Sequence, residues 1–199
     1  MAGPRKLAAH RPSRKTVIVD AAIHVFATSG FADASINDVA HKAGVAVTAV
    51  YYHFSGKEEL YEASVRRALS TLTEVVAAGL PGGDPVSVEN LHPVIDAVWD
   101  WVDAHPKSAT LLQCCLAEKE LNVRRAFDHL FDAGVSLRRR ASAAESARRT
   151  LALRTLVETI FAIHALPTDT GPLGGRSQAE LRNSVHGVST RLIGSGPSK

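Results

Sequence analysis

The chain has 199 residues, of which 45% are hydrophobic and 22% charged, and a chain of this size and composition can bury a core without disulfides or a bound metal. Its two cysteines, Cys114 and Cys115, are adjacent, its first residues lack the apolar segment of a secretory signal, and no run approaches about 18 uninterrupted apolar residues, so we expect a cytoplasmic chain without a membrane segment. The net charge of +3 comes entirely from residues 1–67, which hold nine basic and six acidic residues. This imbalance fits a polyanionic partner, and it equally fits a charged tail that is only solvated.

Apolar residues recur at spacings of three and four, and turn signals fall between stretches of helical length, so we expect an all-α fold. Four helices are expected in the N-terminal part: Ser13 or Arg14 to Ser29, which ends at Gly30, then Ser35 to Gly44, Ala46 to His53, and Lys57 to Ala78. After a loop rich in Gly and Pro, five more are expected: Asn90 to Ala104, Lys107 to Lys119, Asn122 to Ser142, Glu145 to Leu166, and Ser177 to Ile193.

Residues 35–54 have the pattern of a helix-turn-helix motif. Ser35 can cap the first helix, Gly44 permits a positive φ in the turn, and a second short helix follows. The residues left on the outer face of this second helix are the ones that a DNA groove would meet: Ala46, Val47, Thr48, Tyr51 and Tyr52. Helical hairpins with a glycine turn also occur without DNA binding, so the pattern alone leaves both interpretations open.

The run from Ile18 to Leu60 resembles the DNA-binding domain of the tetracycline-repressor (TetR) family. The resemblance is carried by Ala21, Ala22, Phe26, Gly30, Phe31, Ser35, Ile36, Asp38, Val39, Ala40, Ala43, Gly44, Val45, Tyr51, Phe54, Lys57, Glu58 and Leu60. It implies a basic flexible arm over residues 1–15, a helix-turn-helix DNA-binding domain over 16–60, a helical ligand-binding and dimerisation domain over 61–193, and a disordered tail over 194–199.

The family's DNA contacts, carried over by position, give a set of expected site residues. Phosphate contacts fall on Ser35, Tyr51, His53 and Lys57, and base-edge contacts fall on Asn37, Ala46, Val47, Thr48 and Tyr52. Asn can pair with adenine and the methyl groups suit the thymine methyl, whereas this set holds no arginine to read guanine, so we expect an operator weighted to A·T pairs. Three positions depart from the family pattern, namely Ala46, Thr48 and Gly56, and Ala46 predicts a poorly capped recognition helix.

Two C-terminal helices are expected to form a homodimer interface. The final helix carries a narrow apolar seam, Leu181, Val185, Val188 and Leu192, and the helix before it contributes Leu153, Leu156, Val157 and Ile160. A dimer would present two recognition helices to successive major grooves. The alternative is that both stripes belong to the core of one chain.

The middle helices are expected to hold a pocket for a small, largely apolar inducer, with candidate lining residues Trp99, Trp101, Leu112, Cys115, Phe127 and Phe131. The same residues also fit plain core stripes. No metal-ligand spacing and no nucleophile with a base occurs, so we expect no cofactor, no metal and no enzyme activity. The expected function is a transcriptional regulator, most simply a repressor that binds a palindromic double-stranded DNA operator and is released by its inducer. The alternative is a DNA-binding regulator without a small ligand, controlled by a protein or by the thiols of Cys114 and Cys115.

Overall fold

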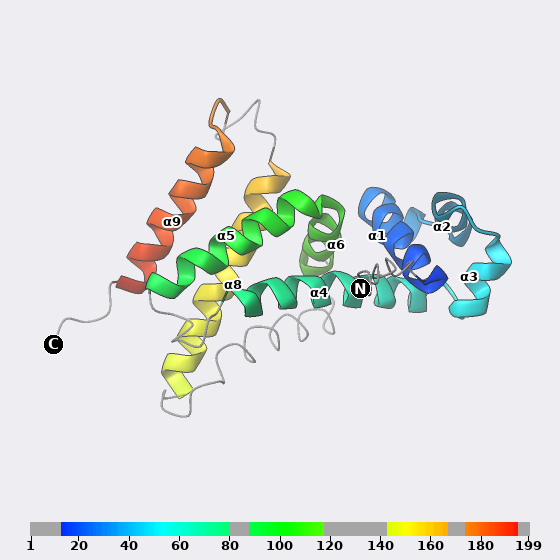
Figure 1. Ribbon diagram of the computed structural model, residues 1–199, viewed down its shortest axis with the longest axis horizontal. Helices are drawn as coiled ribbons and strands as arrows, with labels where there is room; N and C mark the ends of the chain where they lie inside the picture. Colours follow the sequence, from blue (N-terminus) through cyan, green and yellow to red (C-terminus); the bar gives the residue numbers. More distant parts are fainter. Residues whose placement is uncertain (1–12, 80–87, 118–142, 167–173, 195–199) are drawn as a thin grey trace, which may run out of the picture. The chain divides into compact units, whose positions relative to one another are not determined.

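The computed structural model of the protein describes residues 13–79, 88–117, 143–166 and 174–194 (Figure 1). All regular secondary structure in these ranges is α-helical, which confirms the expected all-α fold. The chain divides into two compact units, residues 1–64 and 65–199, and the helix α4, Lys57–Ala78, runs from the first unit into the second.

The first unit contains α1 (Arg14–Asp33), α2 (Ile36–Ala43), α3 (Val47–His53) and the first turns of α4. α1 packs on both α2 and α3. The most deeply buried apolar side chains come from all four helices: Ile18, Ala22, Phe26, Val39, Ala40, Val50 and Leu60. This shared core fixes the angle between α2 and α3, because burying these side chains is the main favourable term that holds such short helices in place.

Gly30 interrupts α1 where the sequence predicts the helix to stop. Its φ of 75° and ψ of 172° are not helical, yet helical backbone continues on the far side to Asp33. Only glycine takes this conformation without a steric penalty. The kink brings Phe31 against Tyr61, with ring centroids 4.9 Å apart, and Tyr61 also meets the ring of Phe26 edge-on at 5.1 Å. These aromatic contacts lock the end of α1 onto α4.

By length and composition α1 also suits a membrane span, with a mean hydropathy of 1.2 over 18 residues. Asp20 interrupts the apolar run of this helix. Ile18, Ala22 and Phe26 are at most 2% exposed inside the first unit, so α1 has the environment of a core helix.

The second unit contains the remainder of α4 together with α5 (Val88–Ala104), α6 (Pro106–Ala117), α8 (Ala143–Ala165) and α9 (Gln178–Gly194). α5 packs on α6, α8 and α9, and α8 packs on α6 and α9. The predicted starts at Asn90 and Glu145 were each two residues late, since the helices begin at Val88 and Ala143, directly after Ser87 and Ser142 in the sequence. The predicted helix over Asn122 to Ser142 lies outside the described residues.

A charged network joins α5 to α9. Arg182 donates from Nε to Asp96 at 2.6 Å and from a terminal nitrogen to Asp100 at 2.8 Å, while His186 Nε2 lies 2.9 Å from the same Asp96 oxygen. Burial raises the pKa of Asp96, but hydrogen bonds and charge from Arg182 and His186 outweigh it and hold that pKa below its ordinary value. The network therefore fixes how α9 lies along α5.

Candidate nucleic-acid interface

The start of α2 is closed by a reciprocal cap between Ser35 and Asp38. The Ser35 hydroxyl oxygen accepts from the Asp38 amide at 3.2 Å, and the Ser35 amide donates to the Asp38 carboxylate at 3.1 Å. The Ser35 hydroxyl also donates to that carboxylate. Two backbone amides are thus satisfied locally, and the hydrogen of the Ser35 hydroxyl is already in use within the protein.

A left-handed turn at Gly44, with φ 66° and ψ 34°, separates α2 from α3. The Gly44 amide donates to His41 O at 3.2 Å, and the Val45 amide donates to Ala40 O at 3.0 Å, which satisfies carbonyls at the end of α2. α3 then begins after Ala46, which makes no side-chain capping bond. The departure from the family pattern at Ala46 therefore has the expected local consequence.

One face of α3 is buried and the opposite face is open. Val50 is fully buried against the core, whereas Tyr51 is 56% exposed and Tyr52 85% exposed. Ala46 and Thr48 are also exposed, and Val47 and His53 are half-buried. On α2, Asn37 is exposed and Ser35 half-buried. The structure thus leaves the predicted contact residues of α3 accessible on a short helix whose other side is fixed.

Lys57 lies at the start of α4, and its ammonium is bound within the protein. Nζ donates to the backbone carbonyls of Ala32 at 3.0 Å and Ala34 at 3.1 Å, and it lies 4.6 Å from the centroid of the Phe31 ring. An ammonium has three N–H groups, so one remains for a DNA phosphate. Sequence reasoning missed this internal role, because the two carbonyls lie more than twenty residues away along the chain.

The same part of α4 is capped by Ser55 and Glu59. The amide and the hydroxyl of Ser55 both donate to the Glu59 carboxylate at 2.7 Å. The backbone hydrogen bond, followed by the side-chain bond, lowers the pKa of Glu59, and the charge of Lys15 contributes in the same direction. The carboxylate is thereby held at the positive end of the helix, where it is favoured.

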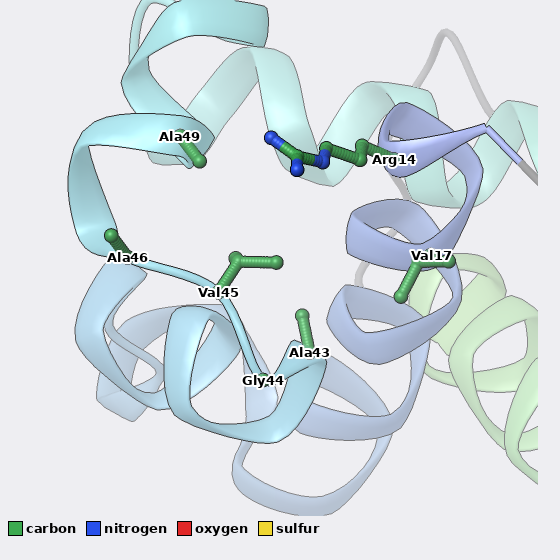
Figure 2. A pocket seen from close by; sticks show the side chains of 7 residues that line it. All are labelled: Arg14, Val17, Ala43, Gly44, Val45, Ala46 and Ala49. Carbon is green, nitrogen blue, oxygen red and sulfur yellow. The ribbon is translucent and has the colours of Figure 1, made fainter.

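A groove of about 710 Å³ lies between α1 and the turn of the motif (Figure 2). It is lined by Arg14, Val17, Ala43, Gly44, Val45, Ala46 and Ala49. The Arg14 side chain extends from α1 across this groove toward Ala49 on α3 (Figure 2). Arg14 begins α1, at the start that the sequence predicts for the first helix, and it adds a cation beside the candidate recognition helix.

In the second unit, four of the six predicted pocket residues are described, and all four lie in the core. Trp99, Trp101, Leu112 and Cys115 are at most 3% exposed, while Phe127 and Phe131 lie outside the described residues. A cavity between α5, α6 and α8 is lined by other side chains. Cys114, unlike Cys115, is exposed. The assignment of the four residues to a ligand pocket remains a prediction.

The predicted dimer residues are mostly covered already within one chain. Leu156, Val157, Ile160, Leu181 and Val185 are at most 3% exposed, and Val188 is 50% exposed. For Leu153 and Leu192 the side chains lie outside the described part. These five side chains are covered within one copy, so a contact with a second copy would need other, exposed residues on or beside these helices. Such residues exist, since Leu151 is 64% and Leu166 45% exposed.

Across the ranges that the structure describes, no group of three or more His, Cys, Asp or Glu side chains is arranged to hold a metal ion. The chemistry at the helix-turn-helix surface is therefore that of hydrogen bonds, methyl groups, aromatic rings and positive charge.

Comparison with known proteins places these features in a wider group. Residues 18–64 match the model for bacterial regulatory proteins of the tetR family. A curated relative, the HTH-type transcriptional regulator SrpR of Pseudomonas putida, is 46% identical over 59 residues, which is 30% of this chain and 28% of the relative. The alignment thus spans well under half of that protein, and the name is that of a regulator of transcription, not of an enzyme.

Solved structures resemble the whole fold. A TetR-like transcriptional regulator from Rhodococcus sp. RHA1 has a TM-score of 0.69 at 22% identity, covering 95% of this chain and all of that one. The multidrug binding protein EbrR, solved in complex with imidazole, has a TM-score of 0.61 at 22% identity, covering 95% and 99%. These likenesses show a common all-α fold with an N-terminal helix-turn-helix domain.

Proposed function

The chain carries the N-terminal domain of the tetR family of bacterial regulatory proteins, and from this premise we propose that it is a transcriptional regulator that binds a palindromic DNA operator as a dimer. The observation that carries the proposal is the open face of α3, where Thr48, Tyr51 and Tyr52 are exposed while Val50 is buried. A short helix fixed on one side and open on the other is the element that a helix-turn-helix protein inserts into the major groove.

The proposed base contacts are made by α3 and by Asn37. Ala46, Val47 and Thr48 offer methyl groups toward thymine, Asn37 offers a bidentate amide for adenine, and Tyr52 lies beside them. These side chains favour an operator whose specific positions are A·T pairs. Arg14 stands outside this set and, as an exposed cation, suits a phosphate or a base edge equally well.

The proposed phosphate contacts come from groups around the rim of α3. Tyr51 and His53 lie on α3 itself, and Lys57 has one N–H that the internal carbonyls leave free. Ser35 has its hydroxyl engaged by Asp38, so a phosphate at the start of α2 would be bound by the first-turn backbone amides or after the cap rearranges. These contacts position the protein and make binding dependent on salt.

A second copy of the chain is the proposed partner of α8 and α9. Their exposed stripes carry Leu151, Thr155 and Ala162 on α8, with Leu166 directly after its end, and Ser184, Gly187 and Val188 on α9. Leucines flanking small side chains permit two helices to approach closely, and exposed leucine is costly without cover. A symmetric pair would present two copies of α3 to two half-sites.

Control by a small molecule completes the proposal. An inducer that binds the second unit more tightly in one arrangement of the dimer would shift the spacing of the two α3 helices and release the operator, which is repressor behaviour. Support comes from the fold shared with EbrR, which was solved with imidazole bound.

The test is selection of bound duplexes from a random DNA pool at two salt concentrations. An enriched inverted repeat, rich in A·T at its specific positions, is the expected result. Binding that falls with salt and enriches no motif would contradict the proposal, because it would reduce the interaction to phosphate attraction alone.

A further inference from the structure

A cavity of about 160 Å³ lies in the second unit where the last turns of α5 and α8 meet the first turn of α6. Its floor is apolar, since Val102, Ala109 and Phe161 are at most 6% exposed. Its polar wall is formed by Asp103, Thr110, Gln113 and His164. The residues predicted to bind a ligand do not line it. Its size suits a molecule no larger than a single ring with a short substituent.

His164 has no hydrogen to offer to a ligand in this cavity. Its Nδ1 lies 2.8 Å from the carbonyl oxygen of Ile160, and its Nε2 lies 3.2 Å from Oδ1 of Asp103. Both neighbours belong to the protein, so both ring nitrogens are already engaged and neither is left for a ligand. The ring also lies edge-on to Trp99, with centroids 4.5 Å apart, which fixes its orientation.

The other polar groups on the wall mainly accept hydrogen bonds. The Thr110 hydroxyl donates to the carbonyl of Pro106 at 2.9 Å, so only its lone pairs remain. Among backbone groups, the Ala109 amide donates to His105 O at 3.1 Å and Pro106 has no N–H. Asp103 keeps its second carboxylate oxygen, and Gln113 alone offers both a donor and an acceptor. A ligand that donates hydrogen bonds therefore fits this wall better than a ligand that only accepts them.

Helix ends add to the preference for positive charge. The lining includes the last turns of α5 and α8, whose final carbonyls carry the partial negative charge of a helix C-terminus. The start of α6 opposes them with one positive end. Two negative ends against one positive end, together with the partly exposed Asp103 carboxylate, leave the cavity attractive to a cation.

The geometry points to a binding site for a small organic ammonium ion, with its apolar body on Val102, Ala109 and Phe161 and its N–H groups on Asp103 and Thr110. Binding itself does not depend on the DNA-binding proposal, whereas a role for this ligand as the effector rests on it. The site is distinct from the bulky core residues on which sequence reasoning placed the inducer.

Calorimetric titration of the full chain with three probes of one ring size, benzylammonium, benzyl alcohol and benzoate, tests the class of ligand. We expect benzylammonium to bind at least about tenfold more tightly than benzoate. Asp103→Asn keeps the shape and removes the charge, so it should erase that preference, and Ala109→Leu should block all three probes by filling the cavity. Glu74→Gln, which removes an exposed carboxylate of α4 elsewhere in the second unit, is the matched control and should change nothing.

Any of three results would overturn the proposed site. Benzoate could bind as tightly as benzylammonium, no probe could give heat, or benzylammonium could still bind both the Asp103→Asn and the Ala109→Leu variants. Circular dichroism and Tm establish that each variant folds, and Thr110→Val gives a milder second variant that should weaken benzylammonium binding and leave benzoate binding unchanged. Duplex selection runs in parallel with the wild-type chain. If benzylammonium binds but no DNA motif is selected, the ammonium site is supported and the regulator proposal is contradicted. If a motif is selected but benzylammonium does not bind, the regulator proposal is supported and the ammonium site is contradicted.

Discussion

The ammonium of Lys57 lies 4.6 Å from the centroid of the Phe31 ring and donates to the carbonyls of Ala32 and Ala34. It joins the first residue of α4 to the segment that follows the kink at Gly30. The family resemblance assigns the same lysine to a DNA phosphate. Because two of its three N–H groups are used internally, Lys57 can place the start of α4 and still contact DNA.

Replacing Lys57 by Ala should affect both stability and DNA binding. We expect a loss of about 1–2 kcal/mol in the free energy of unfolding, from charge-assisted hydrogen bonds that are partly exposed. The slope of log affinity against log salt should also fall by about one counterion. Chemical denaturation and DNA titration at several salt concentrations measure the two effects. If the variant is destabilised but keeps the wild-type salt slope, Lys57 acts only within the protein and makes no phosphate contact.

Adding a cap to α3 should stabilise the first unit. Ala46 provides no side-chain cap, so Ala46→Ser offers a hydroxyl to the free amides of the first turn and should raise stability by about 0.5–1 kcal/mol. Denaturant unfolding gives this value, with Thr48→Ser as a control that changes a hydroxyl residue inside the helix. Equal or lower stability of Ala46→Ser would mean that the amides are satisfied in another way.

The helix-turn-helix unit was predictable from sequence because its determinants are local. Ser35 and Gly44 delimit α2 as predicted, and Ile36, Val39, Ala40 and Val50 are buried as their spacing indicates. Val45, in the turn between the two helices, is half-buried and lines the groove beside Arg14. A residue in a turn has no helical period, so its direction does not follow from spacing.

The second unit was predicted less well because its features depend on tertiary packing. The apolar seam on α9 was predicted from its spacing, but spacing does not say whether Leu181 and Val185 are covered by the same chain or by another copy, and in one chain both are already buried. The cavity could not be predicted from bulky apolar side chains, because its walls combine small and polar residues from three helix ends. The ion pairs of Arg182 join residues more than eighty positions apart.

Asp96 should make stability depend on pH in the acidic range. Its pKa is lowered in the folded chain, so its contribution is present above the unfolded pKa, near about 4, and is lost as pH falls through the folded pKa. Asp96→Asn should cost about 0.5–1 kcal/mol at pH 7, because the pair is partly screened by solvent. The difference between wild type and variant should shrink as the pH is lowered below about 4.

Thermal unfolding at several pH values measures this dependence. Asp20→Asn, in the first unit, serves as the control for removal of one carboxylate from the chain. A wild-type minus variant difference that stays constant across the acidic range would show that the Asp96 carboxylate contributes through its shape alone.

Charge placed on the exposed stripe of α9 should prevent dimer formation. Val188 is half exposed in one chain, and Val188→Arg would bury an unpaired cation at the proposed contact. We expect a monomer by sedimentation, with the helix content of wild type. Gln178→Arg adds the same charge at an exposed position in the first turn of α9 and should leave the dimer intact. If the Val188→Arg variant dimerises with wild-type affinity, the dimer interface does not include Val188.

The central claim is that α3 reads base pairs in two symmetric half-sites, and duplex selection with a Val47→Asn chain tests it most directly. Val47 offers only methyl groups, whereas an amide at this position prefers adenine. We expect an inverted repeat in which the same one or two positions of both half-sites change while the rest of the wild-type motif persists. An unchanged motif, or a change in only one half, would contradict it.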